Sequence, residues 1–170
     1  MNRIYQLELS TLRAYWIIAA FVGVNVVFPQ LFHLVPGGGV AWLPIYFFTL
    51  VGAYKYGWKV GVLTAVASPL SGYVIFGMPM LELLPSMLLK SVLLALFASG
   101  AACRMRKVSL PVMCAVVLAY QLAGGMIEWI LCGDVAFAFQ DFRTGIPGML
   151  LQIIGGYALL SGRISRLMAK

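Results

Sequence analysis

The feature that most constrains this chain is a series of six apolar runs separated by short turns. The runs cover residues 14–35, 39–56, 58–76, 81–102, 108–132 and 145–162. About 17–25 apolar residues are needed for a helix to cross the hydrocarbon core of a bilayer, and these runs lie near that length. Only 10% of the residues are charged and the mean hydropathy is +0.97, whereas about 25% are charged in soluble domains. The sequence therefore predicts an all-α integral membrane protein with six transmembrane helices in one domain, residues 1–170.

The basic residues predict which ends of the helices face the cytoplasm. Ten of the 12 Lys and Arg residues would lie on one side of a six-helix arrangement, and Arg143 alone on the other. The ten are Arg3, Arg13, Lys55, Lys59, Arg104, Arg106, Lys107, Arg163, Arg166 and Lys170. Because cytoplasmic loops are enriched in Lys and Arg, both termini are expected in the cytoplasm. The first run is expected to be a retained helix rather than a cleaved signal peptide, since no A-x-A site follows it.

Several function classes are disfavoured by what the sequence contains. The net charge of +7 does not indicate nucleic-acid binding, because the basic residues are scattered between apolar runs. The three cysteines, Cys103, Cys114 and Cys132, are far apart and imply neither a disulfide framework nor a metal site. The chain has no GxxxxGK[ST], HExxH or GxSxG motif. We therefore expect no enzyme, metal or cofactor in this chain.

Lys90 is the twelfth cation, and it lies inside the fourth run. It would be about 13 Å below the outer boundary, at 1.5 Å per residue. A Lys at the centre of a membrane helix costs roughly 2.5–3.5 kcal/mol on insertion scales, so it is expected to face a protein interior or a wet cavity. Glu82, Ser86 and Lys90 are spaced by four residues and are expected to share one helix face.

Other polar residues of the spans fall at a similar depth. The fifth run carries Gln121, Gly124, Gly125 and Glu128 at the spacing of one helix face. Their gathering between the midplane and the outer surface, with aromatic neighbours, predicts an outward-opening polar pocket for a small ligand. The predicted substrate-binding residues are Asn25, Trp42, Tyr46, Tyr73, Glu82, Lys90, Gln121, Glu128, Trp129 and Gln152.

Structural interpretations of the same residues stand beside this one. Lys90 and Glu128 would in that case form a tie between two helices, without a ligand. Trp42, Trp129 and His33 would be interfacial residues, since aromatic side chains are enriched at membrane boundaries. Residues 133–144 would be either a lid on the membrane surface or a plain connection.

Small residues recur every four positions on two of the predicted helices. Ala19, Ala20 and Gly23 lie on the first, and Gly57, Gly61 and Ala65 lie on or next to the third. Small residues at this spacing let helix backbones approach closely. They are expected either to pack within the bundle or to dock a partner membrane protein.

Two longer sequence segments resemble a known protein family. "WLPIYFFTLVGAYKYGWKVGVLTAVASPL" at 42–70 and "QDFRTGIPGMLLQIIGGYALL" at 140–160 are similar to the substrate-binding S components of energy-coupling factor (ECF) transporters. The resemblance extends over about residues 14–162. It implies a six-helix bundle that captures a vitamin or related micronutrient outside the cell. It also implies delivery inward with a membrane T component and two ATPase subunits, in the cytoplasmic membrane of a bacterium or archaeon.

The resemblance also implies a docking surface and a gate. The family docks through an Ala-x-x-x-Ala motif on its first and third helices. This chain has Ala19 and Gly23 on the first, and Gly61 and Ala65 on the third, so small size is kept and the literal motif is not. The loop between the first two helices, residues 34–41, would gate the site, with "PGGG" supplying flexibility.

The substrate is expected to be a small polar or zwitterionic nutrient, because Lys90 and Glu128 offer both signs of charge. Two other classes remain open. One is a membrane scaffold without substrate that resembles the rod-shape subunit MreD. The other is an intramembrane enzyme using Glu82 and Glu128 as paired carboxylates.

Overall fold

The computed structural model describes residues 11–33, 44–105 and 107–162, and this part of the chain is all-helical. The long helices are α1 (Leu12–His33), α4 (Trp58–Phe76), α5 (Leu84–Met105) and α6 (Leu110–Cys132). The shorter ones are η1 (Pro44–Tyr46), α3 (Phe47–Tyr56), α7 (Val135–Ala138), α8 (Gln140–Thr144) and α9 (Ile146–Leu160). The prediction of an all-α fold is confirmed for these residues.

Four of the described helices are long and apolar enough to cross a membrane, namely α1, α4, α5 and α6. Their bounds lie within three residues of the predicted runs at each end. The other two runs correspond to shorter helices, since α3 has 10 residues and α9 has 15. Residues 39–43, the start of the predicted second span, lie outside the described part.

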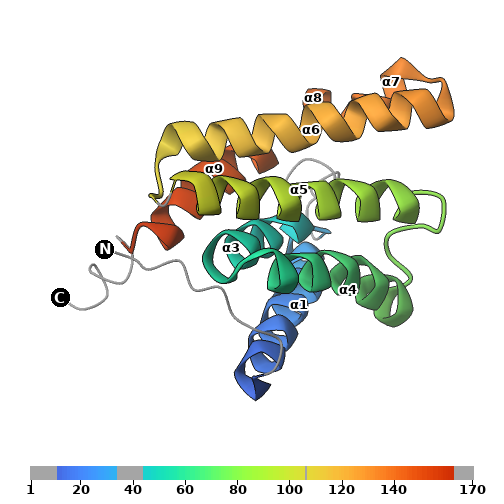
Figure 1. Ribbon diagram of the computed structural model, residues 1–170. Helices are drawn as coiled ribbons and strands as arrows, with labels where there is room; N and C mark the ends of the chain where they lie inside the picture. The colour runs from blue at the N-terminus through green and yellow to red at the C-terminus, as the bar shows by residue number, and fades with distance from the viewer. Residues whose placement is uncertain (1–10, 34–43, 106, 163–170) are drawn as a thin grey trace.

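Helix α5 lies at the centre of the bundle and packs against α3, α4 and α6. Figure 1 shows α5 and α6 side by side and antiparallel, with α9 beneath α6 and α1 crossing at a steep angle. The core between them is built from large buried side chains, including Leu50, Tyr54, Leu94, Met113 and Tyr120. The Tyr54 hydroxyl donates a hydrogen bond of 2.8 Å to the Lys107 carbonyl, which ties α3 to the turn between α5 and α6.

Two glycines explain how the short helix α3 fits into this bundle. Gly57 has φ of 93° and separates α3 from α4 with a single residue, a conformation that glycine adopts at little steric cost. Gly61 is one turn into α4, and a Cβ there would lie 2.8 Å from Ala53 Cα and 3.3 Å from Ala95 Cβ. The small side chains thus let α3, α4 and α5 approach closely.

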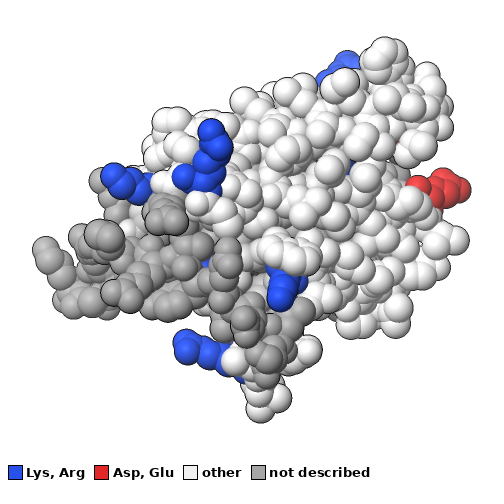
Figure 2. All heavy atoms as spheres, in the orientation of Figure 1, with Lys and Arg blue, Asp and Glu red and all other residues white. Residues whose placement is uncertain are grey.

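The described surface is largely apolar. Figure 2 shows a broad uncharged surface with charged side chains mainly at its margins, and many exposed side chains of α1, α4 and α6 are Leu, Ile, Val or Trp. Exposed apolar areas of this extent are typical of membrane or protein contacts. With the four long helices, this surface supports a membrane protein.

Candidate functional site

The centre of the candidate site is an ion pair buried between α5 and α6. Lys90 Nζ lies 2.7 Å from a carboxylate oxygen of Glu128, and the two side chains are 5% and 4% exposed. Removing two charges from water costs several kcal/mol per ion, and a close opposite charge offsets part of that cost. The structure thus shows the direct contact between Lys90 and Glu128 that the sequence left open.

Gly124 makes this pair possible. A Cβ at Gly124 would lie 2.7 Å from Lys90 Cγ and 3.4 Å from Lys90 Cε. The aliphatic part of Lys90 thus crosses α6 at Gly124 and reaches Glu128, one turn further along. A larger residue at position 124 would occupy the path of the lysine side chain.

Gln121 lies on the same buried face of α6, one turn before Gly124. It is 1% exposed, and neither its Nε2 nor its Oε1 has a hydrogen-bond partner among the described residues. A buried polar group left unpaired costs about 1–3 kcal/mol, so such groups are rare in folded proteins. Gln121 is therefore a buried amide whose hydrogen-bonding groups are not paired by the described residues.

A second buried amide lies where α9 packs on α6. Gln152, on α9, is fully buried, and its Oε1 accepts a hydrogen bond of 3.0 Å from the Tyr120 hydroxyl. Its Nε2 finds no partner within the described ranges. The rings of Tyr120 and Tyr46 lie 5.8 Å apart. Gln152, Tyr120 and Tyr46 therefore join α9, α6 and η1 through one aromatic and polar cluster.

The predicted residue Asn25 belongs to a different cluster. Asn25 Nδ2 donates hydrogen bonds to Thr49 Oγ1 at 3.2 Å and to Ser68 Oγ at 3.0 Å. These contacts join α1, α3 and α4, whereas Lys90 and Glu128 lie on α5 and α6. All three side chains are fully buried.

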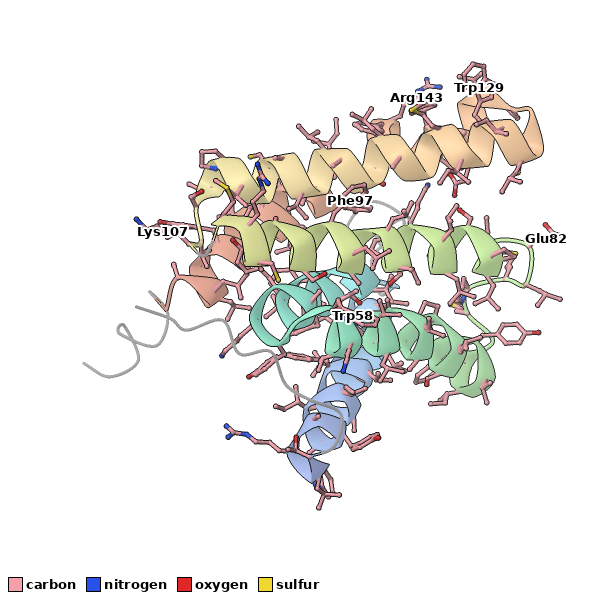
Figure 3. All side chains as sticks on the ribbon, viewed as in Figure 1. Trp58, Glu82, Phe97, Lys107, Trp129 and Arg143 are labelled. Atoms are coloured by element: carbon pink, nitrogen blue, oxygen red, sulfur yellow. The ribbon has the colours of Figure 1, made fainter. Side chains whose placement is uncertain are left out.

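Several predicted site residues are not brought to the ion pair. Helix α5 begins at Leu84, so Glu82 lies in the preceding turn, exposed at the end of the bundle (Figure 3). The expected shared helix face of Glu82, Ser86 and Lys90 therefore does not include Glu82. Trp129 is 48% exposed because it lies about 100° around the helix from Glu128, and it points away from α5 in Figure 3.

Only some of the other residues predicted to lie at the site belong to the described part of the chain. Tyr73 is half-buried near the end of α4. Trp42 and the predicted gating loop 34–41 lie outside the described residues. His33 ends α1, and its side chain is also outside the described part.

The small residues proposed for partner docking separate into two groups. Gly57, Gly61 and Ala65 are buried within the bundle, and Gly61 directly contacts α3 and α5. Ala19, Ala20 and Gly23 are exposed on α1, and a Cβ at Gly23 would meet no atom within 4 Å. Internal packing therefore accounts for the first group, while the second presents a free surface among the described residues.

The predicted loop 133–144 contains two short helices, α7 and α8, rather than an irregular connection. A Cβ at Gly125 would lie 3.0 Å from the Phe139 ring and 3.2 Å from the Ala138 carbonyl oxygen. Gly125 follows Gly124 in α6. Lys90 packs against Gly124, and the segment with Ala138 and Phe139 packs against Gly125 on another side of the helix. The segment packs on the helix that carries Gln121 and Glu128.

Sequence reasoning missed Tyr120, Ser91, Thr49 and Ser68. Tyr120 and Ser91 flank Gln121 and Lys90 in the chain, and Ser91 Oγ lacks a partner within the described part. The positions of Tyr120 and Ser91 next to predicted site residues could have indicated them from the sequence. Within the described ranges, no group of three His, Cys, Asp or Glu residues is arranged to hold a metal ion.

Comparisons with protein-family models, curated proteins and solved structures found no match to this chain.

Proposed function

We propose that this protein is a substrate-binding membrane subunit of an ECF-type importer, an S component that captures a small polar nutrient. The observation that carries the proposal is Gln121, a buried amide without a hydrogen-bond partner in the described chain, on the helix face that holds Glu128. A ligand with a donor and an acceptor would satisfy both of its atoms.

The chemistry around Gln121 favours a polar ligand with ring character. Lys90 would meet a carboxylate, phosphate or carbonyl group, and Glu128 would accept from a donor or cation. Gln152 has a further donor to offer, and Tyr46 with Tyr120 supplies aromatic surface. A small-ligand site commonly combines apolar walls with a few such polar groups.

The membrane arrangement in this proposal has six spans with both termini in the cytoplasm. The segment 39–56, which includes α3, and the helix α9 would be the two additional spans beside the four long helices. The protein would reside in the cytoplasmic membrane of a bacterium or archaeon. It would deliver substrate with a T component and two ATPases, through a contact that includes Ala19, Ala20 and Gly23.

Ligand screening of the purified chain tests this function. A bound ligand at 100 times its Kd stabilises the native state by about 2.7 kcal/mol, which raises Tm by about 5–10 °C for a chain of this size. We expect such a shift with one water-soluble vitamin or precursor, and its loss in Gln121→Met. Glu82→Gln, which changes an exposed carboxylate, is the matched control. Full affinity in both Lys90→Ala and Glu128→Ala would show that the site is assigned wrongly.

One observation favours a second candidate, a membrane scaffold resembling MreD. Lys90 and Glu128 already contact each other at 2.7 Å, as expected of a structural tie between α5 and α6. A scaffold would show no ligand-dependent Tm shift with any nutrient, and no small molecule would co-purify with it. Mass spectrometry of the purified protein therefore distinguishes the two functions.

A further inference from the structure

An apolar groove with Arg104 near one end runs between α5 and α6, away from the ion pair. Its walls are formed by apolar and small side chains, with one cation. They include Phe97, Gly100, Ala101, Arg104, Ala115 and Ala119. Figure 3 shows Phe97 between the two helices and Lys107 at the end of the pair, where α5 leads to α6.

The groove is open because small residues face it. A Cβ at Gly100 would meet no atom within 4 Å, in contrast to Gly124, where the Lys90 side chain fills the corresponding space between the same helices. Gly100 is ten residues from Lys90, about 15 Å along the helix axis. The groove is thus separate from the candidate nutrient site.

The length of the groove and the charge of Arg104 indicate what kind of molecule would fit it. The groove extends from Leu96 to Met105 on α5, about 14 Å at 1.5 Å per residue. This matches one leaflet's hydrocarbon depth, about half of the ~30 Å core. Arg104 lines the end of the groove, and a guanidinium group binds phosphate oxygens in bidentate fashion. Lys107 is exposed nearby.

We propose that this groove binds an anionic phospholipid, with an acyl chain against Gly100, Ala101 and Ala115 and the headgroup phosphate at Arg104. A partner helix in the same place would have to cover Arg104 with apolar surface, which is costly for a charged group. A lipid supplies the opposite charge at the depth where the arginine lies, and basic pockets between membrane helices favour anionic headgroups. This inference does not depend on the proposed nutrient-binding function.

Native mass spectrometry of the full chain tests the proposal. The protein would be released from detergent micelles that contain equal amounts of phosphatidylglycerol and phosphatidylcholine. We expect retained phosphatidylglycerol to exceed phosphatidylcholine. Arg104→Gln should weaken phosphatidylglycerol binding about fivefold, equivalent to about 1 kcal/mol for one basic residue. Lys59→Gln, which removes an exposed cation at the start of α4, should have no effect.

A second variant tests the acyl-chain part of the groove. Gly100→Leu adds a side chain to open space, so it should fold and should reduce retention of both lipids. Equal retention of the two lipids by the wild type, or unchanged retention in Arg104→Gln, would overturn the proposal. So would a Gly100→Leu variant that changes oligomeric state while retaining lipid, because the groove would then serve a protein partner.

Discussion

Two buried amides in this protein differ in how many of their polar atoms are hydrogen-bonded within the described residues. Asn25, between α1, α3 and α4, donates to the hydroxyl oxygens of Thr49 and Ser68. Thr49 donates in turn to the Ile45 carbonyl of η1, and Ser68 donates to the Thr64 carbonyl of its own helix. Gln121, on α6, is equally buried, but neither of its polar atoms has a partner in the described chain. Both residues were predicted from the sequence to bind substrate.

The difference suggests how to distinguish buried polar side chains that hold helices together from those that could bind a ligand. At Asn25 the amide nitrogen joins three helices through two hydrogen bonds, and only its Oδ1 lacks a partner among the described residues. Gln121, two turns before Glu128 on the same buried face of α6, has neither polar atom paired in the described chain, so a ligand that paired them would add to stability. Four measurements, ordered by the expected size of effect, test this contrast.

The largest effect is expected from breaking the ion pair. Lys90→Met should lower the free energy of unfolding by about 3–5 kcal/mol, because Glu128 would be left as an uncompensated buried charge. The double variant Lys90→Met/Glu128→Met should recover most of that loss. Denaturant unfolding in detergent measures both, and a single variant as stable as the double would contradict a buried charged pair.

Replacing each amide by an apolar residue of similar shape tests the contrast directly. Asn25→Leu should cost about 1–3 kcal/mol, since it removes two hydrogen bonds of about 0.5–1.5 kcal/mol each. Gln121→Met should leave the ligand-free protein as stable as the wild type or more stable. Thermal unfolding without ligand compares the two variants. Equal destabilisation would mean that Gln121 is structural as well.

The next effect concerns the path of the lysine side chain. Gly124→Ala should destabilise by about 1–2 kcal/mol, because the new methyl group overlaps Lys90 Cγ and forces a rearrangement. Gly100→Ala is the matched control on the facing helix, where the methyl group enters open space. Comparable midpoints of unfolding for the two variants would show that Lys90 does not cross α6 at Gly124.

The smallest effect is expected at the exposed carboxylate of Glu82. Glu82→Gln should change stability by less than about 0.5 kcal/mol, as is usual for exposed positions. It should also leave any measured ligand affinity unchanged. An affinity loss of tenfold or more, measured by thermal shift, would show that Glu82 contributes to ligand binding.

Much of the architecture was predictable because membrane insertion is a local requirement. A helix must satisfy its own backbone hydrogen bonds in hydrocarbon, so apolar length and turn residues alone located α1, α4, α5 and α6. The expectation that Lys90 and Glu128 lie inside helices came from the positions of those apolar runs, and both are buried in α5 and α6. Their pairing was one of two open interpretations, and the 2.7 Å contact confirms that they meet.

What only the tertiary structure decided is how the helices face one another. Helical periodicity predicted that Glu82 and Lys90 share a helix face. In the structure α5 begins at Leu84, so Glu82 lies in the turn before the helix. Periodicity also treated Asn25 and Gln121 alike, because both are polar residues within a span. Hydrogen-bond partners depend on which helices pack together, a property of the bundle that no single helix encodes. The sequence therefore determined where the long apolar helices lie, and packing decided which of their polar side chains are buried and which of these are hydrogen-bonded.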